Sequence, residues 1–227
     1  MPELPDVAGF KTYLDATALH QRIARSRVID HRIRGQASSQ LLSRRLKGAT
    51  LHDTRPHGKF LFAPAGDAGW LVLHFGMTGE LRYAQQDGDP PRYTRFLIEF
   101  ENDHRLAYLC RRMLGRIDFT DDLSAFIEGE HLGPDALDEE LTLPRFREML
   151  AERRGSLKGL LLDQSFIAGA GNIWGDEVLF QARLHPERRA DDLDADEVKR
   201  FYDTLRRVMR LGEQRDGRID KLPRSWM

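Results

Sequence analysis

The chain has little cysteine and no long hydrophobic run. Its 227 residues include a single cysteine, Cys110, which excludes an internal disulfide and any zinc site built from several cysteines of this chain. No apolar run approaches the roughly 18 residues of a membrane span, and no basic stretch with an apolar core marks a secretory signal. We therefore expect metal-free chemistry without a cofactor in a soluble, cytoplasmic protein with no membrane partner.

An excess of one charge sign is also lacking, because the formal net charge is −1. This average hides a segregation. Residues 118 to 140 hold nine acids and no Lys or Arg, and the remainder has 35 basic and 27 acidic residues. Affinity for phosphates depends on a local basic face, so a nucleic-acid partner is not excluded. The alternative is that the charge runs are only solvated surface.

The two halves of the chain differ in pattern. A sandwich or barrel is predicted by short β-like runs, which are broken by turn residues and cover 27–33, 59–63, 70–75, 80–83, 96–100 and 105–109. Helical spacing of apolar residues predicts helices over 144–150, 157–162, 176–182 and 195–211. The length fits one large or two small domains. The change in composition places a first domain over 1–125 and a helical domain over 126–227.

The chain begins with an unusual pentapeptide, Pro2-Glu3-Leu4-Pro5-Asp6. Removal of Met1 would leave a secondary amine beside a carboxylate. An α-amino group titrates near pH ~8, so a fraction is unprotonated at neutral pH and can form a Schiff base. The alternative is that the prolines stiffen an ordinary start and Pro5 opens a helix.

A glycine-rich segment, Ala168-Gly169-Ala170-Gly171-Asn172, lies between two helical patterns. Its glycines allow a sharp turn and a close approach to a ligand, and amides at a helix start favour an anion. One interpretation is a phosphate site. The other is an interhelical turn that Asn172 caps.

These two motifs together resemble the formamidopyrimidine-DNA glycosylase and endonuclease VIII family of base-excision repair enzymes. The segments His57–Leu61 and His74–Gly79 look like its lysine-bearing loop and its turn with a methionine wedge. Leu4 and Met77 favour the formamidopyrimidine branch. The resemblance implies an α+β fold, with an N-terminal β-sandwich and packed N-terminal helix followed by an all-helical domain containing a helix-two-turn-helix motif.

The resemblance also implies catalytic roles for Pro2, Glu3 and Lys59. The Pro2 nitrogen would attack C1′ of the damaged nucleotide, and the iminium would drive strand cleavage by elimination. Glu3 would act as general acid and base on the sugar, and Lys59 would contact a phosphate near the lesion. The residues implied for DNA binding are Asp6, Met77, Arg111, Arg112, Met113, Lys158, Gly169, Gly171 and Asn172.

Several of these positions carry a specific expectation or departure. Asp6 stands where the family usually has the longer glutamate. Flipping a base leaves a hole that side chains fill; Met77 matches the first wedge, and Arg111 would face the orphan base. Met113 takes an aromatic's place and precedes an extra Leu114. Without DNA contact, both methionines would be core residues.

The helical-domain lysine and the end of the chain leave further alternatives. Lys158 resembles a lysine near the everted base, or it is a solvated helix residue. The family normally ends in a four-cysteine zinc finger or a zincless mimic, whereas no cysteine follows Cys110 before Met227. We expect either a truncated chain or a minimal member without the finger, with weakened and strongly salt-dependent DNA binding.

The predicted function is that of a bifunctional DNA glycosylase and AP lyase. It would remove an oxidised or ring-opened base from double-stranded DNA as a monomer, on the nucleoid if the source is bacterial. The alternatives are a noncatalytic or truncated DNA-binding member of the same fold, which retention of Met1 would favour, and a protein with no DNA partner.

Overall fold

The computed structural model describes residues 1–223 and 226. Positions 224, 225 and 227, which belong to the segment where a zinc finger was expected to begin, lie outside the described residues. The chain forms two compact units, Met1–Pro2 with Phe10–Phe126, and Glu3–Gly9 with Ile127–Met227. They are called unit 1 and unit 2 here. The division thus assigns part of the first helix to the helical unit, which a single cut in the sequence cannot do.

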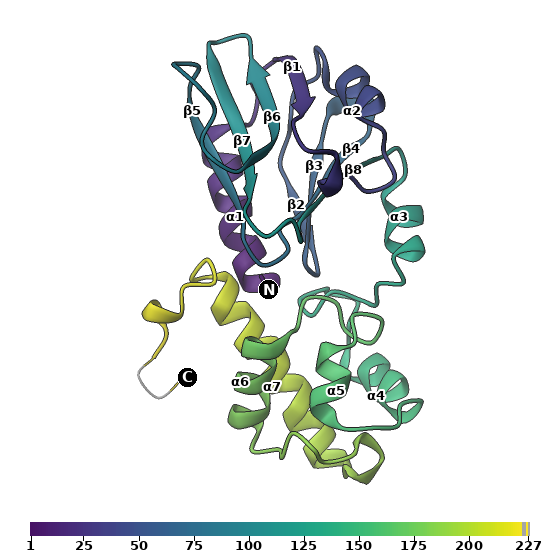
Figure 1. Cartoon of the computed structure of the whole chain (residues 1–227). Helices are drawn as coiled ribbons and strands as arrows, with labels where there is room; N and C mark the ends of the chain where they lie inside the picture. The colour runs from purple at the N-terminus through teal and green to yellow at the C-terminus, as the bar shows by residue number, and fades with distance from the viewer. Residues whose placement is uncertain (224–225, 227) are drawn as a thin grey trace. The chain divides into compact units, whose positions relative to one another are not determined.

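Unit 1 is built on two four-stranded antiparallel sheets (Figure 1). The first sheet has the order β1 (Ile23–Val28), β6 (Thr94–Phe100), β7 (His104–Cys110) and β5 (Gly79–Gln85). The second has the order β2 (Arg55–His57), β3 (Phe60–Pro64), β4 (Trp70–His74) and β8 (Arg116–Thr120). Nearly every residue of β6 and β7 is buried, as expected of strands that are covered on both faces.

Helices complete unit 1. The helix α1 (Leu4–Thr17) begins in unit 2 and continues in unit 1, where Phe10 stacks on Phe75 with ring centroids 3.8 Å apart. The short helix α2 (Ser39–Leu46) starts at Ser38, whose hydroxyl accepts the Leu41 amide. Two 3₁₀ turns, η1 (His31–Ile33) and η2 (Gly66–Ala68), lie in the connections. The predicted β-sandwich with a packed N-terminal helix is confirmed.

Unit 2 is helical, and it confirms the second half of the α+β prediction. Its elements are α4 (Leu143–Ala151), α5 (Leu157–Leu162), α6 (Asn172–Ala182), η3 (Ala190–Asp192), α7 (Ala195–Glu213) and η4 (Ile219–Lys221), while α3 (Leu123–Gly129) spans the division. The helix-two-turn-helix consists of α5, the loop 163–171 and α6. The core of unit 2 includes Phe146, Trp174 and Phe201, together with Leu4 from the first helix.

Two predicted elements have different bounds in the structure. The strand expected over 27–33 is Ile23–Val28, so both of its ends are wrong, and one helix is wrong at its start. The strand expected over 27–33 ends at Val28, because the Asp30 side chain accepts the Arg32 amide and opens η1. The helix expected from Asp176 begins at Asn172. Its first turn is completed by a carboxylate from far away in the sequence, so a local pattern cannot show the true start.

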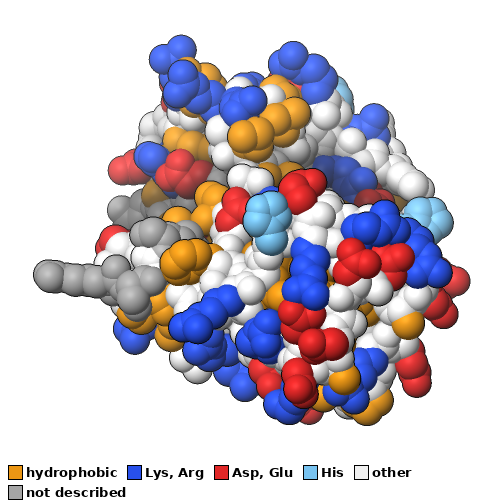
Figure 2. All heavy atoms as spheres, turned by 90° about the horizontal axis from the view of Figure 1, so that it is seen from below, with side chains coloured by type: hydrophobic (Ala, Val, Ile, Leu, Met, Phe, Trp, Pro, Cys, Tyr) orange, Lys and Arg blue, Asp and Glu red, His pale blue; other side chains and the backbone are white. Residues whose placement is uncertain are grey.

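The acidic stretch contributes to the fold as well as to the surface. Asp118 is buried and accepts the backbone amides of Gln36, Ala37 and Phe119. Asp135 is buried as well. On the face shown in Figure 2, basic and acidic side chains are interspersed, so that face is not a uniformly basic surface. Among the described residues, no helix is both long and apolar enough to cross a bilayer.

Candidate functional site

The carboxylate of Glu3 is fixed at the start of α6. Only 2% of this residue is exposed. Its Oε1 accepts the Ile173 amide at 2.8 Å and its Oε2 accepts the Trp174 amide at 3.1 Å. The first amides of a helix lack acceptors within the helix and form its positive end, so a carboxylate there is stabilised. Both oxygens of Glu3 are thereby held in one orientation.

The two glycines of the loop bring the N-terminal segment close. Gly171 has a negative φ of −153°, so glycine is not required here for a left-handed backbone. A Cβ at this position would lie 2.5 Å from the Glu3 carboxyl carbon. The carbonyl of Gly169 accepts the Leu4 amide at 2.9 Å. The anion bound at this helix start is therefore a side chain of the protein, and phosphate contact by the two glycines stays a prediction.

Asp6 secures the same segment from the first turn of α1. Its Oδ2 accepts the Glu3 amide at 2.8 Å, which is half of a capping box. Burial raises the pKa of Asp6, and hydrogen bonds from the Glu3 amide and the Trp174 side chain only partly oppose that rise. The aspartate side chain, although one methylene shorter than glutamate, is long enough for this bond.

Gln164 organises the loop that faces Glu3. Its Oε1 accepts the Gly169 amide at 3.1 Å, and its Nε2 donates to the carbonyls of Ala170 at 2.9 Å and Leu162 at 3.1 Å. Sequence reasoning missed this residue, because a lone glutamine in a loop carries no signal of such a role. The side chain ties the end of α5 to the glycine-rich segment.

Lys158 joins α5 to the start of α6. Its Nζ donates to the Asn172 carbonyl and to Asp176 Oδ1, both at 2.6 Å. The ammonium is thus positioned at the same end of α6 as Glu3, whereas the Asn172 side chain is exposed. A freely solvated Lys158 does not match these contacts, and its placement near an everted base stays a prediction.

Lys59 lies at the tip of the β2–β3 hairpin in unit 1. Gly58 and Lys59 are the two turn residues, and Gly58 has φ +58°. Glycine at the first position of a two-residue loop is typical of a type II′ turn, which suits the twist of the strands. Only 6% of Lys59 is exposed. The hairpin therefore fixes the backbone of Lys59 firmly.

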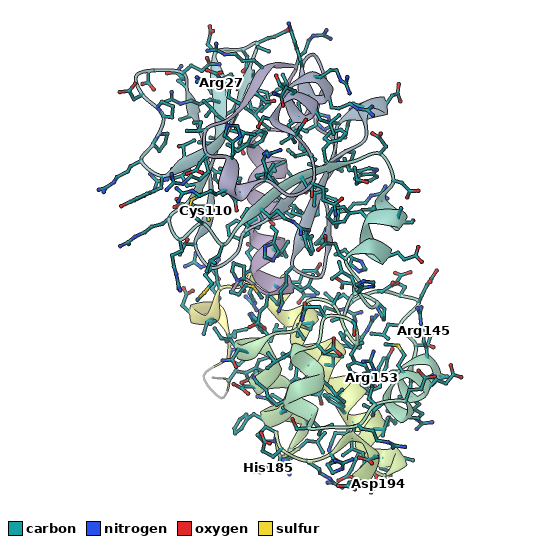
Figure 3. All side chains as sticks on the ribbon, turned by 45° about the vertical axis from the view of Figure 1, so that its right-hand side comes forward. Arg27, Cys110, Arg145, Arg153, His185 and Asp194 are labelled. Carbon is teal, nitrogen blue, oxygen red and sulfur yellow. The ribbon has the colours of Figure 1, made fainter. Side chains whose placement is uncertain are left out.

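Two loops of unit 1 bring Met77 to the segment Arg111–Met113. The Arg112 amide donates to Thr78 Oγ1 at 3.0 Å. Met77 is 47% exposed, so its interpretation as a core residue is wrong. Both arginines are exposed, whereas Met113 is half-buried. Figure 3 labels Cys110, the last residue of β7, which directly precedes this segment. The sequence motif His74–Gly79 includes Thr78, but it gave no indication of the hydrogen bond that Thr78 accepts from the Arg112 amide.

The predicted site residues form two groups. Unit 2 contains Glu3, Asp6, Lys158, Gly169, Gly171 and Asn172, which converge on the start of α6. Unit 1 contains Pro2, Lys59, Met77, Arg111, Arg112 and Met113. Pro2 is bonded to Glu3 through the chain, so the candidate amine directly precedes the fixed carboxylate.

Known families match both units. The profile of the formamidopyrimidine-DNA glycosylase N-terminal domain matches residues 1–117, and that of the formamidopyrimidine-DNA glycosylase H2TH domain matches residues 132–222. The formamidopyrimidine-DNA glycosylase of Acaryochloris marina is 32% identical over 219 residues, with 92% of this chain and 77% of the relative covered. The enzyme of the same name from Thermomicrobium roseum is 34% identical over 229 residues, with the same two coverages, 92% and 77%.

A solved structure shows the same similarity. The formamidopyrimidine-DNA glycosylase of Lactococcus lactis, bound noncovalently to DNA with an AP site, superposes with a TM-score of 0.88 at 26% identity. The superposition covers 94% of this chain and 82% of that one. The two matched domain profiles, the curated relatives and this superposition agree along nearly the whole chain. The chain belongs to the formamidopyrimidine-DNA glycosylase family.

Proposed function

We propose that this protein is a base-excision repair DNA glycosylase with AP-lyase activity, acting on an oxidised or ring-opened base in double-stranded DNA. Family membership supports the activity. The observation that carries the residue assignment is the carboxylate of Glu3, the residue after the candidate nucleophile Pro2, which two amides of α6 hold in one orientation. A general acid or base needs this fixed placement close to the reacting atoms.

The chemistry begins with the Pro2 nitrogen after removal of Met1. The secondary amine forms a bond to C1′, the bond from C1′ to the base breaks, and the base leaves with a proton. The amine loses its own proton, and the bond from C1′ to the ring oxygen O4′ breaks as that oxygen takes up a proton, so the product is an open-chain, positively charged iminium. The iminium then accepts electrons as a C2′ proton is removed and the 3′ phosphate departs. Water hydrolyses the iminium to release the enzyme.

Glu3 transfers protons to and from the sugar in this scheme. Its two amide bonds restrict the carboxylate to one orientation, and Asp6 fixes the backbone that carries it. The Leu4 bond to Gly169 adds a third attachment. Pre-organisation of this kind lowers the cost of aligning a catalytic group with its substrate.

DNA contacts are assigned to both units. Lys59 at its hairpin tip supplies a positive charge for a phosphate near the lesion, and the exposed Asn172 beside Gly171 serves the flanking backbone. The amide of Gly169 is occupied by Gln164, so Gly169 acts through its carbonyl on Leu4. Lys158 faces the everted base, while Met77 and the loop that begins at Arg111 fill the emptied position in the stack.

The expected setting is the cytoplasm, with the protein acting as a monomer. Nothing in the proposed chemistry needs a second copy, because the amine, the carboxylate and the candidate wedge residues all belong to one chain. Gel filtration with light scattering, with and without a short duplex, tests this assignment. A stable dimer in the absence of DNA would contradict it.

The activity is tested by incubating the protein with duplexes that carry one ring-opened purine, one abasic site or no damage. We expect cleavage of the strand that carries the ring-opened purine and of the strand that carries the abasic site, and no cleavage of the undamaged duplex. A protein that binds the damaged duplex without cleaving either substrate, despite a Pro2 terminus established by intact mass, would contradict the proposal. That result would identify the noncatalytic alternative.

A further inference from the structure

Two turns of unit 1 are locked together into a single tip, formed by residues 76–78 and 111–114. A Cβ at Gly76 would lie 2.3 Å from the carbonyl carbon and oxygen of Leu114, so the two backbones are in direct contact. The bond from the Arg112 amide to Thr78 closes the other side. These contacts fix the position of the tip side chains relative to one another.

The tip is supported from inside the sandwich. The Tyr108 hydroxyl donates to the His74 carbonyl at 2.8 Å. A Cβ at Gly115 would lie 1.8 Å from that hydroxyl oxygen, so the chain passes directly over the tyrosine as it leaves the tip. Tyr108 is 1% exposed. The tip therefore stands on a rigid, buried base.

The apolar side chains of the tip differ in exposure. Leu114 is 51% exposed and Met77 is 47% exposed, whereas Met113 is half-buried and has φ +57°. Few residues other than glycine adopt this left-handed conformation. It turns the chain sharply at Met113, and the next residue, Leu114, is the more exposed of the two.

The chemistry around Leu114 indicates a nucleic-acid contact. The exposed Arg111 and Arg112 precede it, and neither guanidinium makes a hydrogen bond or ion pair within residues 1–223 and 226. Proteins that enter the minor groove combine arginine with apolar side chains that wedge between base steps. An exposed leucine beside an exposed methionine, flanked by two such arginines, has that composition.

We propose that Leu114, rather than Met113, is the second wedge, inserted beside Met77 where the damaged base leaves the stack. The proposal rests on the glycosylase function. Met113 supports the turn from its half-buried position, and Leu114 fills part of the emptied space. Insertion stabilises the everted state, so it accelerates base removal. It matters much less once the base is gone, because an abasic site needs no base to be unstacked.

The test compares Leu114→Ala with Met113→Ala and a matched control, Ile29→Ala. Ile29 is 46% exposed and follows β1, outside the tip. Single-turnover base removal is measured on a duplex with one ring-opened purine, and strand cleavage on a preformed abasic site. We expect L114A to slow base removal at least about tenfold and abasic cleavage less than about threefold. M113A is expected to slow base removal less than L114A, and I29A to match the unmodified protein.

A second readout does not depend on catalysis. Fluorescence of 2-aminopurine placed next to the lesion reports unstacking on binding, and L114A should reduce the increase while Leu114→Met restores it. If M113A loses base removal and the fluorescence change while L114A behaves like I29A, the assignment of Leu114 is overturned and the glycosylase proposal stands. If the unmodified protein neither cleaves the abasic site nor changes the fluorescence, both proposals are overturned.

Discussion

Glu3 Oε1 accepts a hydrogen bond from the Ile173 amide at 2.8 Å, across 170 positions of sequence. This contact connects the residue that precedes α1 to the start of α6 within unit 2. It places the candidate general acid and base at the N-terminus of α6. The same bond explains why α6 begins at Asn172, four residues earlier than the sequence pattern predicts.

Replacing Glu3 with glutamine tests this contact directly. The amide side chain has only one oxygen, so one of the two α6 amides loses its acceptor and faces an NH₂ group. We expect Glu3→Gln to lower the free energy of unfolding by about 1–3 kcal/mol, the cost of a buried unsatisfied donor. Denaturant unfolding measures this loss. Under conditions where the variant is folded, base removal should fall by about 10²–10⁴-fold.

The control for that variant is Glu148→Gln on α4, at an exposed position. It makes the same chemical change without a buried partner, so both stability and activity should match the unmodified protein. Normal base removal by E3Q, measured in parallel, would refute a proton-transfer role for Glu3.

Gly171→Ala tests whether space beside Glu3 is required. The added Cβ would lie 2.5 Å from the Glu3 carboxyl carbon, and φ at this position is negative. We expect a loss of about 1–3 kcal/mol from overpacking, together with impaired strand cleavage as the carboxylate shifts. Thermal unfolding and abasic-site cleavage are the measurements. Gly129→Ala is the matched control, because a Cβ there meets nothing within 4 Å, and a G171A protein as stable and active as G129A would argue against the steric account.

The raised pKa of Asp6 leads us to expect that the free energy of unfolding depends on pH. Burial raises its folded pKa above the ordinary value of 3.8, so between these two values the folded state holds a proton that the unfolded state has released. Stability attributable to Asp6 therefore falls as pH rises through this window. Asp6→Asn does not titrate. The unfolding free energy of D6N minus that of the unmodified protein should become more positive from pH ~4 upward, and a difference that is constant or falls with pH would contradict the assignment.

Much of the fold follows from sequence pattern, and the exceptions have identifiable physical causes. Short β-like runs bounded by turn residues locate β3, β4, β6 and β7, and helical spacing of apolar residues locates α5 and most of α7, because both patterns depend only on residues close together in the sequence. Strand β1 departs from its predicted range because a single side chain, Asp30, opens a 3₁₀ turn. The N-terminus of α6 departs because its capping carboxylate comes from Glu3.

The candidate site was partly visible in the same way. The motifs containing Pro2, Glu3 and Gly171 carry the family resemblance, so the sequence identifies these residues without showing how they meet. The binding of the α6 amides by the Glu3 carboxylate could not be predicted. A helix start whose amides are free and one whose amides are bound by Glu3 have the same local sequence. Gln164 acts through three hydrogen bonds and Thr78 through one, all to backbone groups, and such bonds leave no periodic signal.

Thr78→Val tests whether the position of the tip matters while its wedge side chains stay unchanged. Valine matches the shape of threonine but cannot accept the Arg112 amide, so residues 111–114 lose one attachment. A hydrogen bond contributes about 0.5–1.5 kcal/mol net, and we expect base removal to slow between about two- and tenfold. Cleavage of an abasic site should change less. Equal slowing of both reactions would show that Thr78 acts on the chemistry rather than on the wedge.

Lys59→Gln tests the proposed phosphate contact through salt dependence. Loss of one contact should weaken binding to damaged and undamaged duplexes alike and reduce the slope of log K against log salt by about 1. Fluorescence anisotropy across a salt series measures both effects. Lys47→Gln, at an exposed position after α2, removes the same charge elsewhere and should leave the slope unchanged. A slope for K59Q equal to that of K47Q would place Lys59 outside the phosphate contacts.

The central claim is that the nitrogen of Pro2 is the nucleophile, and covalent trapping tests it most directly. The protein is incubated with an abasic duplex and borohydride, digested with trypsin, and the crosslinked peptide is sequenced by mass spectrometry. The account predicts an adduct on the terminal nitrogen of the peptide 2–11, without Met1, and its disappearance in Pro2→Gly with Met1 retained. An adduct on a lysine, or none from a Pro2-terminated protein that binds the duplex, would contradict the account.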